Sequence, residues 1–221
     1  MNRWICRVRP TDPLSIDPER GLLSATIILA DDERTRLQRY IEWLLKVDDR
    51  AALRVLTRET AAGFYGVTPS GVMTFLALPV VRVDTDSAPV DTVMLGRTLL
   101  AEVKASREGV VVSNEVALSP ALAALPPTDS WLPAERGLAG DVVTIIDRAV
   151  ADRADADAST WGGFTLDSLR VAKGLGLFAH PSAQVVTATN AGWKRLMTPA
   201  GQVFVPPPRS GRGVLHLVKA R

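Results

Sequence analysis

Residues 183–205 read AQVVTATNAGWKRLMTPAGQVFV. Three short segments within it, 183–189, 193–197 and 202–205, are rich in β-branched and other apolar residues. They are separated by Asn-Ala-Gly at 190–192 and by Thr-Pro-Ala-Gly at 198–201. Glycine accepts the positive φ of a tight turn and proline presets φ for one, so both separators favour reversal of the chain. The stretch therefore predicts three antiparallel strands joined by two tight turns.

Two helices are predicted just before these strands. In a helix over about 137–152, Val142, Ile146 and Ala149 fall on one face. A second helix is expected over 165–175, where Thr165 is placed to cap the first turn. Glycines 174 and 176 each cost about 1 kcal/mol inside a helix, so this helix should end there.

The first half of the chain also combines apolar residues at helical spacing with short runs typical of strands. A strand is expected over 22–29. It is followed by an amphipathic helix over 31–46, whose buried face would carry Leu37, Ile41 and Leu44. Short extended runs at 52–58, 63–67 and 72–83 then predict an antiparallel meander. Pro79 removes a ladder hydrogen-bond donor, so the third run should lie at an edge, bulge or split there. Another helix is predicted over 93–105.

Four prolines between 120 and 133 mark the main break in this pattern. We therefore expect a mobile N-terminal tail over 1–21, an α+β sub-domain over 22–118, a Pro-rich connection over 119–136, a unit of paired helices and sheet over 137–205, and a Pro/Arg-rich tail over 206–221. The fold class is α+β: an antiparallel meander with amphipathic helices, followed by a helical pair and a small three-stranded antiparallel sheet.

Charge is balanced over the chain and uneven along it. The 221 residues carry 26 Lys and Arg against 24 Asp and Glu, but residues 160–221 hold eight basic residues against the single acid Asp167. Such asymmetry hints at an acidic or polyanionic partner. No apolar run approaches the roughly 18 residues of a membrane helix, and no secretory signal is present. We expect a soluble cytoplasmic protein that does not bind membranes.

Composition argues against several kinds of chemistry. One Cys and two His are too few for a zinc site, so no metal is expected. Residues 174–179 match a relaxed dinucleotide fingerprint but end a helix where that motif must open one, so no cofactor is expected. No Gly-x-Ser-x-Gly elbow occurs. Whether the protein is an enzyme stays open at this level.

Two groups of residues are candidate binding sites. Trp193, Lys194 and Arg195 place an aromatic ring beside two cations on a predicted hairpin, as a nucleic-acid contact would require. Arg170 and Lys173 on the preceding helix would extend that contact surface. Trp161 and Phe164, separated by two glycines, form a candidate ligand-stacking platform. Asp129-Ser130-Trp131 is interpreted as a turn with a buried tryptophan.

Three segments carry a resemblance to known sequences: Leu125–Trp131, Leu169–Phe178 and Gly192–Val205. Together they resemble a family of hypothetical proteins from high-GC actinobacteria, over roughly residues 24–205. The resemblance implies no activity, cofactor or catalytic residue that can be carried over.

Three hypotheses about function remain. The first is a non-enzymatic protein that acts by binding or assembly, through a protein partner or as a homodimer. The second is a nucleic-acid-binding regulator, in which the helix over 165–175 and the strands over 183–205 form a winged-helix-like unit. The third is an enzyme with a small-molecule site between the sub-domains, near Trp161 and Arg170.

Overall fold

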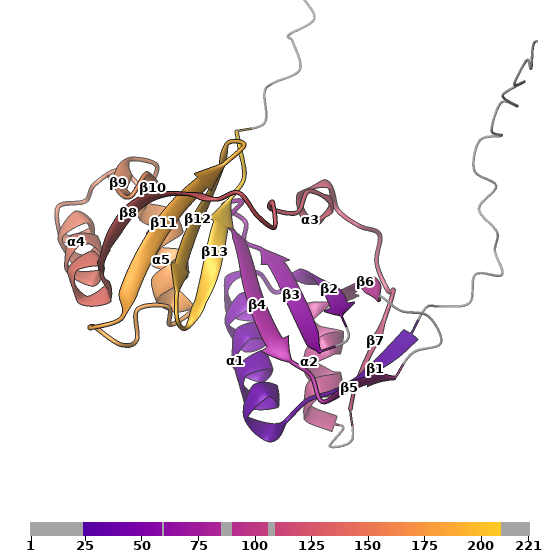
Figure 1. Ribbon diagram of the computed structural model, residues 1–221. Coiled ribbons are helices and arrows are strands. Elements are labelled where there is room, and N and C mark those ends of the chain that lie inside the picture. Colours follow the sequence, from indigo (N-terminus) through magenta and orange to yellow (C-terminus); the bar gives the residue numbers. More distant parts are fainter. Residues whose placement is uncertain (1–23, 59, 85–89, 106–108, 209–221) are drawn as a thin grey trace, which may run out of the picture.

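The computed structural model describes residues 24–58, 60–84, 90–105 and 109–208 (Figure 1). The first half contains β1 (Ser24–Ile28), α1 (Asp31–Val47), β2 (Ala52–Arg58), β3 (Ala61–Val67), β4 (Met73–Pro79), β5 (Arg82–Asp84), β6 (Asp91–Leu95), α2 (Gly96–Ala105) and β7 (Val110–Ser113). The second contains α3 (Pro120–Ala123), β8 (Leu132–Leu138), α4 (Ala139–Ala151), β9 (Ser159–Trp161), β10 (Phe164–Thr165), α5 (Leu166–Gly174), β11 (Gln184–Asn190), β12 (Trp193–Thr198) and β13 (Gly201–Val205). The mixed helices and antiparallel sheets confirm the α+β class. The predicted N-terminal tail and positions 209–221 of the C-terminal tail lie outside the described residues.

One large sheet runs through both halves. Its eight strands follow the order β6-β2-β3-β4-β13-β12-β11-β8. The three strands predicted over 183–205 are confirmed as β11, β12 and β13, but they do not form a separate sheet. β13 pairs with β4, placing Gln202 opposite Phe75, Val203 opposite Thr74, and Phe204 opposite Met73. This pairing satisfies backbone groups that two smaller sheets would each leave open at an edge.

The helices of both halves cover the same face of this sheet. Residues directly opposite in neighbouring strands point to the same side, as Thr74 and Val203 do. Thr74 contacts Tyr40 of α1 through its hydroxyl, and Val203 lies in the core beneath α5. We call this the helical face and the opposite one the outer face. Figure 1 shows α1 and α2 against β2–β4, and α4 and α5 beside β11–β13.

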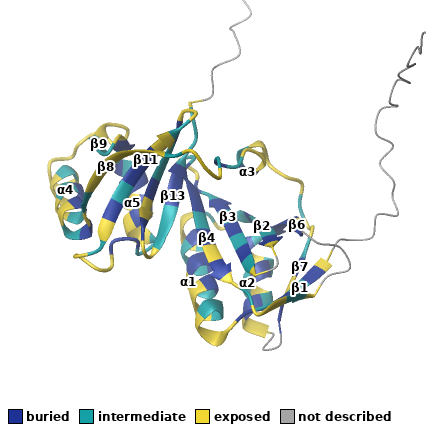
Figure 2. Cartoon of the chain, in the orientation of Figure 1, coloured by how far each residue is buried: buried dark blue, intermediate teal, exposed yellow. Residues whose placement is uncertain are grey.

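Each half has its own apolar core under its helices, and Figure 2 shows the buried residues following the strands. Phe64 and Leu37 are central to the first core, and Phe164 and Ile146 to the second. Trp43 of α1 packs against both cores. Leu175, just after α5, does the same. The two halves are therefore joined by the β4–β13 ladder and by these two shared side chains.

Some predicted boundaries are wrong. The helix expected to begin at 93 begins at Gly96, because Asp91–Leu95 pairs with β2 as strand β6. Residues 132–138, placed in or beside the Pro-rich connection, form β8. Pro133 is accommodated because β8 is an edge strand, where a missing N–H leaves no partner unsatisfied. Of the alternatives predicted for the run over 72–83, the split is confirmed: the run divides after Pro79 into β4 and β5, which belong to different sheets.

Tyr40 fastens α1 to the sheet through a buried hydroxyl. This hydroxyl lies 2.7 Å from Thr74 Oγ1 and 3.2 Å from the carbonyl oxygen of Phe64, to which it donates. Burial is the main cause that raises the pKa of Tyr40 well above its ordinary value. The phenolate is thus strongly disfavoured in the folded state.

Tyr40→Phe should lower the free energy of unfolding by about 1–2 kcal/mol at pH 8, because Thr74 and the Phe64 carbonyl each lose one buried hydrogen bond. Above pH 10 the unfolded tyrosine ionises while the folded one does not, so wild-type stability falls with rising pH. The difference in free energy of unfolding between wild type and Tyr40→Phe should therefore be about 1.4 kcal/mol smaller at pH 11 than at pH 8. Urea titrations at both pH values measure this difference. If the difference is the same at both pH values, the Tyr40 hydroxyl is not buried in the folded state as described.

Candidate functional site

The residues predicted to contact nucleic acid are not gathered on one surface. Successive residues of a strand point to opposite faces, so Lys194 lies on the helical face and Arg195 on the outer face. The Lys194 ammonium donates to the carbonyl oxygen of Gly163. Trp193 is 8% exposed and packs on the outer face against Met73 and Phe204.

The two cations of α5 have different surroundings. Arg170 is exposed on α5, while Lys173 forms an ion pair with Asp147 of α4. Of the expected ligand platform, Phe164 is 1% exposed inside the second core. Trp161 is partly buried, and its ring lies against Gly137 of β8. The two aromatic residues therefore present no shared open surface.

A groove on the outer face brings together residues that the sequence analysis did not connect. We call it the linker groove, because the chain between β7 and β8 forms one wall. Its volume is about 400 Å³. The sheet residues that line it are Leu56, Arg58, Ala61, Ala62, Gly63, Tyr65, Phe75, Ala77, Arg195, Gln202 and Phe204. The linker contributes Leu125, Pro126, Pro127, Thr128 and Trp131.

Aromatic rings form a continuous floor in this groove. The ring centroids of Tyr65 and Phe75 are 4.5 Å apart, and Phe75 meets Phe204 edge-on at 6.3 Å. Trp131 continues the row at 5.8 Å from Phe204. These distances are within the range of favourable aromatic pairs. The row crosses the β4–β13 junction, so the groove exists only because the two halves share one sheet.

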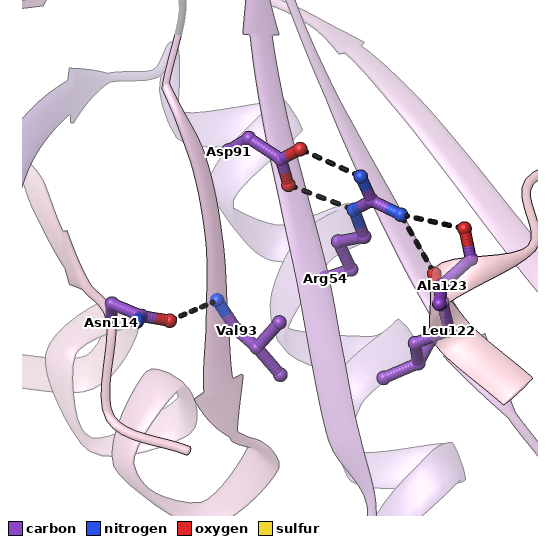
Figure 3. A network of polar contacts seen from close by, with 6 residues as sticks. All are labelled: Arg54, Asp91, Val93, Asn114, Leu122 and Ala123. Carbon is purple, nitrogen blue, oxygen red and sulfur yellow. Dashed lines mark hydrogen bonds and ion pairs between the residues drawn. The ribbon is translucent and has the colours of Figure 1, made fainter. Parts of the chain in front are cut away.

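The linker wall is held in place by a forked arginine on β2 (Figure 3). Arg54 donates through Nε and Nη2 to the two carboxylate oxygens of Asp91, at 2.8 and 2.6 Å. Its Nη1 donates to the carbonyl oxygens of Leu122 and Ala123 in α3. The planar guanidinium makes all these contacts at once, which a lysine ammonium has no geometry to copy.

Two further contacts fix the linker at its ends. The side-chain oxygen of Asn114 accepts from the Val93 backbone N–H of β6, also drawn in Figure 3. At the other end the Trp131 indole N–H donates to the carbonyl oxygen of Pro127 at 3.0 Å. Ser130 before it has a φ of 58°, which confirms a turn there. The tryptophan is partly buried.

Replacing Arg54 should loosen the linker. Arg54→Ala removes one bidentate ion pair and two hydrogen bonds to carbonyls, so we expect the free energy of unfolding to fall by about 1–3 kcal/mol. Backbone amides of 119–131 should exchange with solvent faster than in the wild type, as followed by hydrogen-exchange mass spectrometry. Arg54→Lys, which keeps the charge without the fork, should give an intermediate rate. Unchanged exchange in Arg54→Ala would show that other contacts position the linker.

A second cavity lies on the helical face between α1 and the end of α5. Its volume is also about 400 Å³. Arg36, Arg39, Trp43 and Lys46 line it from α1, at a spacing that places all four on one side of the helix. The Trp43 ring packs so closely on Gly174 that a Cβ there would lie 2.6 Å from the indole nitrogen. The cavity thus combines three cations with an aromatic ring, but its lining also includes the carboxylate of Glu42, and Arg36 is paired with Glu33.

Two features are absent from the part of the chain that the structure describes. No helix there is long and apolar enough to cross a membrane. No cluster of three or more His, Cys, Asp or Glu side chains there has the arrangement to hold a metal ion.

One feature of the sequence indicates that the outer face is covered or contacted. Residues 73–78 read MTFLAL, so apolar side chains point from β4 to both faces of the sheet. A strand of a sheet with one solvated face normally alternates apolar and polar residues. Met73 and Phe75 on the outer face therefore indicate that something covers or contacts that face.

Comparison with known proteins finds similarity in structure only. No family model and no curated protein matches the sequence. A DNA polymerase sliding clamp from Pseudomonas aeruginosa, solved with a ligand, is 11% identical with a TM-score of 0.51, over 90% of this chain and 68% of the clamp chain. The DNA polymerase III subunit beta from the same organism is 10% identical, with a TM-score of 0.53 over 84% of this chain and 64% of that one.

A DNA polymerase sliding clamp from Caulobacter crescentus gives the same result: 11% identity and a TM-score of 0.53, over 83% of this chain and 65% of the clamp chain. At such identities the likeness shows the fold alone. The fold of this chain is similar to that of sliding clamps, which are α+β proteins, and the chain spans about two thirds of their length.

Proposed function

We propose that this chain is a non-enzymatic binding protein with a sliding-clamp-like fold, which docks an apolar segment of a partner protein in the linker groove. The observation that carries the proposal is the row of aromatic rings between the outer face and the linker, in which Tyr65, Phe75 and Trp131 are partly exposed around the buried Phe204. The similarity in fold to sliding clamps and to a polymerase subunit supports a role in assembly.

The composition of the groove is that of a protein-binding surface. Tyrosine, tryptophan and arginine dominate the binding energy of protein interfaces, and Tyr65, Trp131 and Arg195 all line the groove. Its lining includes no His, Cys, Asp or Glu side chain, so its described walls hold no pair for acid–base chemistry. Binding is the activity that these walls support.

The test fills the groove with a side chain. Ala77 is exposed on β4 and lines the groove, so Ala77→Trp would occupy the space of a bound segment. Ala134→Trp is the matched control, because Ala134 is an exposed alanine on β8 of the same sheet, away from the groove lining. A displayed library of random 12-residue peptides is selected on the full-length chain and screened against both variants.

We expect enriched peptides that bind the wild type and Ala134→Trp equally well and lose at least tenfold in affinity for Ala77→Trp. Thermal melts of all three proteins exclude a general loss of folding. If no selected peptide distinguishes Ala77→Trp from Ala134→Trp, the groove is not the docking site and the proposal is wrong.

A second candidate function is nucleic-acid binding on the helical face. The cavity with Arg36, Arg39, Trp43 and Lys46 favours it, since cations that contact phosphates and an aromatic ring that stacks on bases are what single strands require. This surface replaces the predicted hairpin contact, whose Lys194 and Arg195 point to opposite faces. It is also consistent with the polymerase clamps that share the fold.

Fluorescence anisotropy with a labelled 30-nucleotide single strand at low salt tests this second function. Arg39→Gln combined with Lys46→Gln should weaken binding and reduce the slope of log affinity against log salt by about 1–2. Lys194→Gln combined with Arg195→Gln is the control and should leave the slope unchanged. No complex at micromolar protein would end this hypothesis.

Self-association is the remaining expectation, and the edge strand β8 is its best surface. Leu132 and Leu138 are exposed there at 70% and 49%, and an unpaired strand edge is a template for another strand. Sedimentation of the full-length chain at several concentrations should show a dimer that Leu138→Lys weakens. A monomer at every concentration would exclude it.

A further inference from the structure

Arg195 carries a partly buried charge that faces only neutral groups among the described residues. Its Nε donates to Gln202 Oε1 at 2.7 Å, and its Nη2 approaches Met197 Sδ at 3.0 Å. The guanidinium carbon lies 5.6 Å from the Trp131 ring centroid and 6.0 Å from that of Phe204. The ion pairs found in the described part of the chain all involve other cations.

This arrangement is costly without a counter-ion. Charges removed from water are normally paired or neutralised, because the low-dielectric surroundings do not replace their hydration. Burial lowers the pKa of Arg195, and no carboxylate opposes that effect. Two aromatic faces and a glutamine amide hold the guanidinium in one place, so it is prepared for an anion entering the linker groove.

A second arginine extends the positive charge along the groove. Arg58 is the exposed last residue of β2 and lines the groove together with Arg195. The lining includes no Asp or Glu. Between these two cations lie the rings of Tyr65 and Phe75. The groove is therefore apolar along its floor and positive in its walls.

The charge of residues 209–221 argues against their being the occupant. Residues 209–221 carry four basic residues and no acidic one, and residues 1–23 carry four basic against three acidic residues. A basic segment would add repulsion to the uncompensated arginines. Complementarity requires an occupant of the opposite sign. Within residues 1–23 the three acidic residues all lie in 12–19, a stretch without a basic residue. The full-length chain carrying Asp12→Asn, Asp17→Asn and Glu19→Gln should therefore bind an acidic partner segment with unchanged affinity, whereas tighter binding would show that 12–19 occupies the groove.

We infer that the linker groove recognises an acidic apolar segment of a partner protein, in which an Asp or Glu carboxylate pairs with Arg195 beside a side chain that rests on the aromatic floor. This inference rests on the proposed docking function and makes it specific. Arg195 is the specificity-determining residue because its geometry is fixed, and Arg58 adds a second, exposed cation. A guanidinium presents a fork of donors that matches a carboxylate.

The experiment uses peptides enriched in the selection described above. For one acidic peptide, a second version replaces each Asp by Asn and each Glu by Gln, which removes charge at constant shape. Wild-type protein should bind the acidic version about tenfold more tightly, the effect of one charge-assisted hydrogen bond of ordinary strength. Arg195→Gln should reduce the ratio to near one, while Arg195→Lys should keep part of it. Arg58→Gln should reduce it only slightly.

The outcomes separate the two proposals. Peptides that depend on Ala77 but show no acidic enrichment, with equal affinity for both versions, overturn the carboxylate inference and leave the docking function standing. Absence of any Ala77-dependent peptide overturns both. If a single-stranded oligonucleotide displaces the bound peptide at lower concentration than the acidic peptide does, and this effect is lost in Arg195→Gln, the groove binds nucleic-acid phosphate. In that case the inference is likewise wrong. Equal melting temperatures of the variants show that folding is intact.

Discussion

Phe164→Ala is expected to lower the free energy of unfolding by about 3–5 kcal/mol, the range for truncating a fully buried phenylalanine. The Phe164 ring is 1% exposed and is among the largest fully buried side chains of the described chain. It packs in the second core with residues from α4, α5 and β11–β13, among them Ile146, Leu169 and Leu196. Urea denaturation followed by circular dichroism measures the change.

The control for this prediction is the neighbouring aromatic residue. Trp161 is only partly buried at the edge of the same core, so Trp161→Phe should cost about 1 kcal/mol or less. Phe164→Leu, which retains most of the buried volume, should fall between the two. If Phe164 belonged to an open ligand platform, Phe164→Ala would leave stability nearly unchanged, and that result would contradict the packing described above.

The elements of the fold could be predicted where local pattern and final environment agree. The helix expected over 31–46 is observed over 31–47, and the one expected over 165–175 over 166–174. Thr165 accepts from the Ser168 backbone N–H as a helix cap should. In both helices the apolar period alone identifies the buried face, because that face packs on a sheet directly beneath it.

Prediction failed where pairing with a distant segment decides the structure. β6 reads as the start of a helix because Val93 and Met94 continue the apolar period of α2, but hydrogen bonds to β2 make it a strand. Pro133 and the charged residues at 135 and 136 make the sequence of β8 untypical of a strand. It forms a strand because the edge of β11 is open to pairing. No local signal carries information on either partner.

The candidate site was missed for the same reason. The linker groove assembles side chains from five strands and the linker, and residues as distant as Tyr65 and Phe204 meet through the β4–β13 ladder. Arg195 was identified, but for nucleic acid and together with Lys194. Successive residues of a strand point to opposite faces, so the predicted hairpin already places Lys194 and Arg195 on different faces. This was the one sequence feature that argued against a shared nucleic-acid contact.

Trp131→Ala should have the largest effect on partner binding, a loss of about 2 kcal/mol or more, equivalent to roughly thirtyfold in affinity. The Trp131 ring does three things at once. It ends the aromatic floor beside Phe204, it supports the Arg195 guanidinium at 5.6 Å, and its indole N–H closes the linker turn on Pro127. Anisotropy with a groove-selected peptide measures the affinity, and a urea titration measures the expected stability loss of about 1–2 kcal/mol.

Trp131→Phe separates these contributions, because it keeps an aromatic ring and removes the hydrogen bond to Pro127. If the ring dominates, Trp131→Phe retains affinity within about threefold, because an aromatic ring still ends the floor. The lost neutral hydrogen bond then lowers only the free energy of unfolding, by about 0.5–1.5 kcal/mol, and amides of 125–131 exchange faster. If closure of the linker dominates, the phenylalanine variant loses nearly as much affinity as the alanine variant. If Trp131→Ala binds the peptide within twofold of wild type, Trp131 is not part of the docking surface. The stacking of Arg195 on this ring then has no role in carboxylate recognition.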